Sequence, residues 1–122
     1  MQFIDLKTQQ KRIRADIEDR IKKILDHGQY ILGPEGKELE KRLSDFVGTK
    51  YAVGVASGTD ALLMALMAYD VGPGDAVITT PFTFVASAEV IKLVGARPVF
   101  VDINPDTFNI DTEKLKNVIT EL

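Results

Sequence analysis

A turn of small and polar residues separates an apolar run from a helical pattern near the middle of the chain. Tyr51 to Ala56 is almost wholly apolar, as in a strand covered on both faces, and Ser57-Gly58-Thr59 follows it. Glycine has no Cβ, so a bound group can approach its backbone closely. The first turn of a helix carries N–H groups without intrahelical partners and a partial positive charge. The stretch is therefore a candidate site for a phosphate group.

A simpler interpretation of the same turn is a helix cap. Ser57 and Asp60 have the S-x-x-D spacing of a capping box, which starts a helix without binding a ligand. Three small residues are a weak signal, so spacing alone favours the cap over the phosphate site.

Composition limits the other chemistry that the chain could perform. The 122 residues are 45% hydrophobic and 27% charged, as expected for one soluble globular domain. A net charge of −3 gives no electrostatic footprint for nucleic acid or an anionic membrane. The absence of cysteine and the single histidine, His27, predict no metal site and no disulfide. No run has the length of a membrane span, and the expected location is the cytoplasm.

Two helices are expected before the turn. Isoleucines at helical spacing predict the first over residues 8–26, with Gly28 ending it. A loop that contains Tyr30, Ile31 and Leu32 follows, and it is expected to pack. Pro34 suits the first position of a second helix, which extends to about Val47 and is ended by Gly48. The expected buried face of this second helix consists of Leu39, Leu43, Phe46 and Val47.

Strands and helices alternate after the turn. The residues from Asp60 to Tyr69 predict a helix that is apolar on nearly every side, and Asp111 is expected to cap a last helix. Strands are expected over Ala76–Thr79 and Val99–Ile103, with a helix between them that ends at Gly95. Strand–helix–strand units of this length pair in parallel, so the fold class is α/β.

Four motifs in fixed order resemble the start of the sugar aminotransferases that use pyridoxal 5'-phosphate (PLP), the DegT/DnrJ/EryC1/StrS family. They are Ser57-Gly58-Thr59-Asp60-Ala61-Leu62, Gly72-Pro73-Gly74-Asp75, the segment Thr80 to Ser87, and the segment Gly95 to Ile103. The resemblance covers almost the whole chain. It implies the N-terminal part of the large domain of the type I PLP-dependent aminotransferase fold, a mostly parallel sheet flanked by helices.

The resemblance also implies roles for three residues. The turn matching Gly58 and Thr59 binds the PLP phosphate through backbone N–H groups, in agreement with the argument from the helix terminus. The aromatic residue matching Phe84 stacks against the cofactor ring, a task that suits a flat, apolar face. Without the resemblance, Phe84 would be interpreted as a core residue beside Phe82.

The family's Schiff-base lysine and the acid that pairs with the pyridine nitrogen lie beyond the region matched here. None of the chain's lysines occupies the family's lysine motif. Residues 1–122 are therefore expected to be an incomplete N-terminal portion of the PLP-binding large domain. This portion holds no catalytic residue and should be inactive alone.

The function implied for the intact protein is transfer of an amino group to a nucleotide-linked keto sugar, with glutamate as the expected donor. A homodimer is expected from the same resemblance. The alternatives are a sugar dehydratase of the same family that uses PLP or its amine form, a free-standing nucleotide- or anion-binding module, and a non-catalytic remnant. No G-x-G-x-x-G follows the first apolar run, which weighs against a dinucleotide module.

Overall fold

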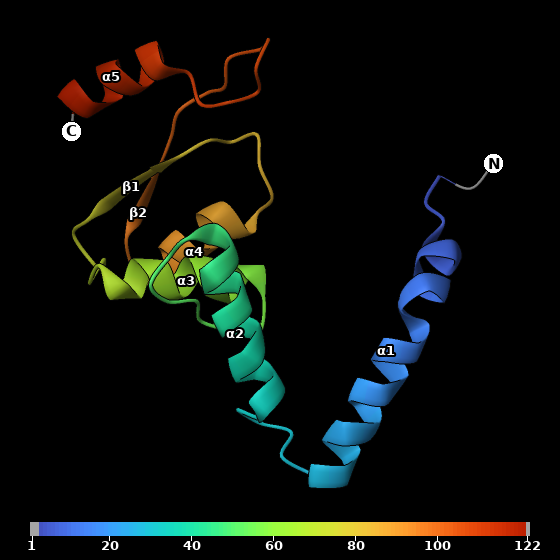
Figure 1. Ribbon diagram of the computed structural model, residues 1–122. Helices are drawn as coiled ribbons and strands as arrows, with labels where there is room; N and C mark the ends of the chain where they lie inside the picture. Colours follow the sequence, from blue (N-terminus) through green and yellow to red (C-terminus); the bar gives the residue numbers. More distant parts are fainter. Residues whose placement is uncertain (1–2, 122) are drawn as a thin grey trace. The chain divides into compact units, whose positions relative to one another are not determined.

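The computed structural model describes residues 3–121 (Figure 1). The chain divides into two compact units, one ending at Gly54 and one beginning at Val55. None of the helices within residues 3–121 is long and apolar enough to cross a membrane.

The first unit is a pair of helices, α1 (Leu6–His27) and α2 (Pro34–Val47). The Asp5 side chain accepts a hydrogen bond from the Thr8 N–H and caps the start of α1. Both helices end at a glycine in the left-handed region, Gly28 with φ 68° and Gly48 with φ 73°. The predicted helix ends and the predicted first-turn position of Pro34 are confirmed.

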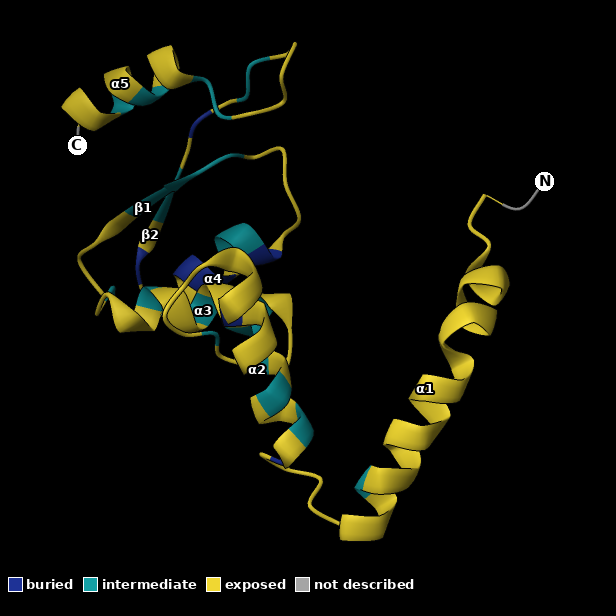
Figure 2. Cartoon of the chain, viewed as in Figure 1, coloured by how far each residue is buried: buried dark blue, intermediate teal, exposed yellow. Residues whose placement is uncertain are grey.

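The apolar faces of this unit are not covered by other described residues. No residue of α1 is buried, as Figure 2 shows by its almost uniform exposed colour. The predicted buried face of α2 is wrong for this chain, because Leu39, Leu43, Phe46 and Val47 are all exposed. The periodic pattern identifies the side of a helix that suits burial, but it does not supply the element that would cover it.

The second unit alternates helices and strands as expected. It comprises α3 (Gly58–Ala68), β1 (Ala76–Thr79), α4 (Ala86–Leu93), β2 (Arg97–Phe100) and α5 (Thr112–Glu121). β1 and β2 pair in parallel with Ala76 opposite Arg97 and Thr79 opposite Phe100. The α/β class and the parallel pairing are confirmed. The second strand lies two to three residues before its predicted position.

A small core holds this unit together on one side of the sheet. α4 packs against both strands and α3 packs against α4, as Figure 1 shows. Val90, Ile91 and Ala96 are buried at 2%, 2% and 1% exposure, and Leu63, Leu66, Val71, Val77 and Val94 pack around them.

The strand predicted over Tyr51 to Ala56 is wrong. The structure has no strand there, and the two-stranded sheet contains only β1 and β2. A strand needs a neighbour to accept and donate its backbone hydrogen bonds, and no described residue pairs with this segment. The apolar run therefore leads into α3 without regular secondary structure.

The carboxyl end of β2 is tied to α5 by Asp102. Its Oδ1 accepts from the Ile103 N–H at 2.8 Å and its Oδ2 from Lys114 Nζ at 3.2 Å. These contacts hold the pKa of the Asp102 carboxyl below its ordinary value, and the hydrogen bond from the Ile103 N–H has the largest effect. Asp111 caps α5 as predicted, since its Oδ1 accepts from the N–H groups of Glu113 and Lys114.

Candidate functional site

The N-terminus of α3 is capped and still keeps two free backbone donors. Ser57 Oγ accepts from the Asp60 N–H at 3.1 Å, and the Ser57 carbonyl accepts from the Ala61 N–H at 3.1 Å. Within residues 3–121, no acceptor receives the N–H groups of Gly58 and Thr59. The cap and the phosphate site are thus compatible, because they use different N–H groups of one helix turn.

Gly58 leaves open space beside these donors. Its backbone is not in the left-handed region, so its conformation does not require glycine. A Cβ built at this position would meet no atom of the chain within 4 Å, so packing does not require glycine either. The missing side chain instead gives an external group access to the backbone N–H groups.

Phe84 is exposed, and its neighbour Phe82 is the one that pairs. The Phe82 ring lies 5.7 Å from that of Phe108, whereas the Phe84 side chain is 75% exposed. The alternative of Phe84 as a core residue beside Phe82 is therefore not what the structure shows. A flat aromatic face presented to solvent is a suitable surface for a planar ligand.

The residues of the candidate site lie at or just before the starts of α3 and α4, two helices that pack against each other. Gly58 and Thr59 begin α3, and Phe84 lies two residues before the start of α4. A groove of about 230 Å³ is lined by residues of α3, β1 and α4, including Leu62, Thr79 and Ser87. The free donors thus begin α3, and the exposed ring stands just before α4; these are the two helices that form the core.

The α3 N-terminus combines the partial positive charge of the helix dipole with one negatively charged side chain. The half-buried Asp60 is the acidic residue in the first turn, and its own N–H already bonds to Ser57. The helix dipole places partial positive charge at the free N–H groups of Gly58 and Thr59, which favours an anion. Residues 3–121 hold no group of three histidine, aspartate or glutamate side chains that could bind a metal ion.

One contact near this region could not be read from the sequence. Glu40 Oε1, on α2, accepts from the Gly54 N–H at 2.7 Å within the first unit. It fixes the segment that leads toward the turn. The two residues are separated by 14 positions and share no local motif, so spacing gives no signal for the contact.

The chain belongs to the DegT/DnrJ/EryC1/StrS aminotransferase family, whose family model matches residues 11–122. Over 120 residues it is 58% identical to the UDP-2-acetamido-2-deoxy-3-oxo-D-glucuronate aminotransferase of Pseudomonas aeruginosa, covering 98% of this chain and 33% of that protein.

Two solved structures show the same likeness. A DegT DnrJ EryC1 StrS aminotransferase from Brucella abortus is 48% identical with a TM-score of 0.92, over 99% of this chain and 34% of that one. The PLP form of the sugar aminotransferase Spr1654 from Streptococcus pneumoniae is 43% identical with a TM-score of 0.74, over 82% and 26%. The chain thus spans about a third of the length of the first two relatives. The fold is that of the N-terminal part of these aminotransferases.

Proposed function

We propose that this chain forms part of the cofactor site of a PLP-dependent aminotransferase. The observation that carries the proposal is the pair of free N–H groups at Gly58 and Thr59, next to space that a side chain at Gly58 would fill. Residues 1–122 would make up an N-terminal portion of the PLP-binding large domain. The family membership of the chain supports this assignment.

The residues present fit the cofactor. The N–H groups of Gly58 and Thr59 would hold its phosphate at the positive end of α3, and the exposed Phe84 ring would lie against the pyridine. When bound, PLP supplies the electron sink through which an amino group leaves a donor and joins a carbonyl acceptor. The residues of this chain would bind and orient; none is assigned a proton transfer.

For the whole enzyme we propose transfer of an amino group from glutamate to a nucleotide-linked keto sugar. The support is the 58% identity to a Pseudomonas aeruginosa aminotransferase named for a UDP-linked 3-oxo sugar acid. Formation of 2-oxoglutarate from glutamate, dependent on the keto sugar nucleotide, tests the reaction. Release of a deoxygenated sugar without consumption of an amino donor would instead support the dehydratase alternative. A cytoplasmic location stays a prediction from the sequence.

The binding role can be tested on the chain itself with pyridoxine 5'-phosphate, which lacks the aldehyde and does not react with lysine. We expect a dissociation constant on the order of 1 mM by ligand-observed NMR, since two N–H groups and one stacked ring make a small set of contacts. Pyridoxine and inorganic phosphate should bind more weakly. Equal affinity for inorganic phosphate would support an anion-binding module, and no binding by any of the three would contradict both assignments.

We propose a homodimer as the assembly of this protein. Large apolar side chains are exposed on both units, including Ile13 and Ile17 on α1 and Leu62, Met64 and Met67 on α3. Exposed apolar side chains of this size promote association in water when they lie together on a face. Sedimentation velocity at several concentrations should therefore show dimers or larger species. A single monomeric species at every concentration would contradict the proposal.

A further inference from the structure

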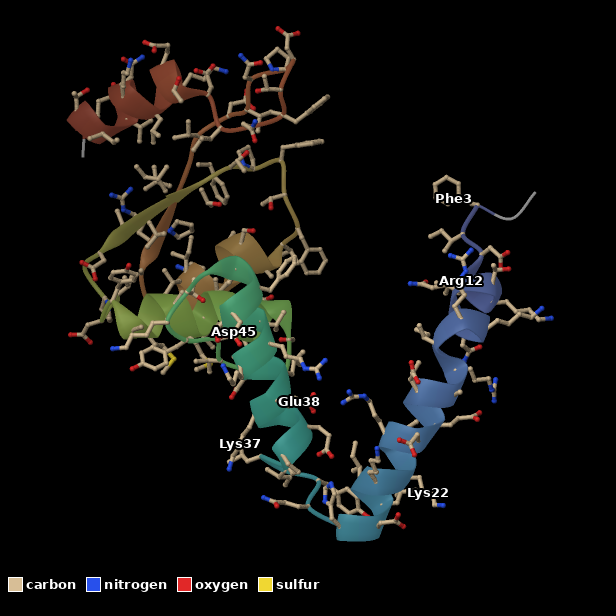
Figure 3. The ribbon with its side chains drawn as sticks, in the orientation of Figure 1. Phe3, Arg12, Lys22, Lys37, Glu38 and Asp45 are labelled. Carbon is tan, nitrogen blue, oxygen red and sulfur yellow. The ribbon has the colours of Figure 1, made fainter. Side chains whose placement is uncertain are left out.

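The connection between α1 and α2 is organised around the ring of His27, the last residue of α1. Its Nδ1 accepts from the Gln29 N–H at 3.0 Å, and its Nε2 lies 3.2 Å from Glu35 Oε1 in the first turn of α2. One imidazole thus contacts the end of one helix, the loop and the start of the next helix. Figure 3 shows α1, the connecting loop and α2, with Lys22 labelled on α1 and Lys37 and Glu38 on α2.

Gln29 in turn closes the loop on itself. Its Nε2 donates to the Leu32 carbonyl at 3.4 Å, and a Cβ built on Gly33 would lie 2.5 Å from the Gln29 carbonyl oxygen. Leu32 has φ 52°, a conformation that costs free energy for a residue with a side chain. The loop conformation therefore depends on how firmly Gln29 is held. That conformation presents Tyr30, Ile31 and Leu32 to solvent at 67%, 83% and 82% exposure. The prediction that this loop packs is therefore wrong, because no described residue covers these side chains.

The hydrogen bonds define the protonation state that this geometry requires. Because the Gln29 N–H is a donor, Nδ1 of His27 must carry a lone pair. The neutral ring then has its proton on Nε2, from which it donates to the Glu35 carboxylate. Protonation of Nδ1 makes it a donor that faces the Gln29 N–H, which is also a donor. The hydrogen bond between His27 and Gln29 is then lost. The contact with Glu35 becomes an ion pair.

We propose that His27 stabilises the loop over residues 28–33 in a pH-dependent way. The neutral ring accepts the hydrogen bond from the Gln29 N–H, and the protonated ring loses it. The α1–α2 contact at Glu35 persists in both states. As the pH falls from 8 to 5, the range in which imidazoles change charge, the Tyr30–Leu32 segment changes from one ordered conformation to a more mobile state.

Charged side chains other than His27 also lie between the two helices. The other charged side chains between the helices are of both signs and line a cleft of about 450 Å³: Asp16, Asp19, Arg20, Lys23, Glu35 and Glu38. Hydrogen bonding by its own backbone N–H lowers the pKa of Glu35 most, and His27 and Arg20 lower it further. The Glu35 carboxyl therefore stays ionised over this pH range, and its Oε1 faces Nε2 of His27.

The test is an NMR titration of the 122-residue chain from pH 8 to pH 5. Ring nitrogen shifts should show the Nε2–H tautomer at pH 8. As the ring becomes charged, the protection factor of the Gln29 amide should fall about 2- to 10-fold, the loss of one hydrogen bond. The Thr49 amide is a matched control, because it follows the other glycine-capped helix end and bonds to the Ser44 carbonyl without an imidazole.

Two variants distinguish a pH-dependent role of His27 from a contact that does not respond to pH. His27→Asn keeps an acceptor for the N–H two residues on but cannot titrate, so Gln29 protection should become independent of pH. Glu35→Gln removes the carboxylate beside Nε2 and leaves Nδ1 unchanged, so the hydrogen bond from the Gln29 N–H should persist at pH 8. An Nδ1–H tautomer at pH 8, or Gln29 protection unchanged across the His27 titration in the unmodified chain, would overturn the proposal.

Discussion

Ile91→Ala is expected to destabilise the second unit by about 2–5 kcal/mol, the usual cost of truncating a fully buried isoleucine. Ile91 is 2% exposed and belongs to a core with few other buried residues. Neighbours on α3, α4 and β1 would lose contacts at once, and a core this small has little capacity to repack. The effect should therefore be a large part of the unit's stability.

Amide exchange measures this cost in the unit concerned. The Arg97 N–H bonds to the Asp75 carbonyl and the Val101 N–H to the Thr79 carbonyl, so both report opening of the paired β1 and β2. Their exchange should accelerate strongly in Ile91→Ala. Ile119→Ala, at an exposed position of α5, is the control and should change stability by no more than about 0.5 kcal/mol. Similar effects of the two variants would show that the core is misplaced.

Phe84→Ala is expected to lower the affinity for pyridoxine 5'-phosphate about 2- to 10-fold, the range for loss of one aromatic contact. Stability should stay within about 0.5 kcal/mol of the unmodified chain, since the side chain is 75% exposed and packs against little. Affinity and stability are thus predicted to respond separately.

Phe82→Ala provides the matched comparison. Phe82 pairs with Phe108 at 5.7 Å between ring centroids, so its removal should cost about 0.5–1.5 kcal/mol of stability and leave affinity unchanged. The two phenylalanines stand two positions apart and are assigned opposite roles. Unchanged ligand affinity in Phe84→Ala would remove the stacking role from the proposed site.

Local signals predicted the helices well. Gly28 and Gly48 end α1 and α2 in the left-handed conformation, Pro34 opens α2, and Asp111 caps α5, all as expected. These features depend on a few adjacent residues, whose backbone preferences act without tertiary contacts. β1 and β2 were also predicted, with an error of two to three residues in β2, because strand ends depend on pairing.

Features that depend on distant partners were predicted less well. The apolar run Tyr51 to Ala56 has the composition of a strand, but a strand forms only where another strand pairs with it. The apolar face of α2 fails in the same way, since Leu39 and Phe46 have no described element over them. Composition reports a tendency to be buried, whereas burial itself requires a partner.

In the candidate site too, the features set by adjacent residues were predicted and those that depend on distant partners were not. The Ser57 cap follows from spacing, and the structure shows its hydrogen bond to Asp60. Whether Phe84 or Phe82 packs could not be decided from two phenylalanines separated by one residue. Only the structure shows that Phe82 pairs with Phe108 and that Phe84 is exposed. The phosphate-binding role of Gly58 and Thr59 remains a proposal.

The amide resonances of Gly58 and Thr59 during titration with pyridoxine 5'-phosphate give the most direct test of this account. Both should shift in a saturable manner, since their N–H groups lack acceptors among the described residues and would donate to the phosphate. Gly36, near the start of α2, is the control amide, because Pro34 leaves that helix terminus with one donor fewer. Gly58→Val should abolish the response by filling the open space at the turn. Shifts of equal size at Gly36, or an undiminished response at Thr59 in Gly58→Val, would contradict phosphate binding at this turn.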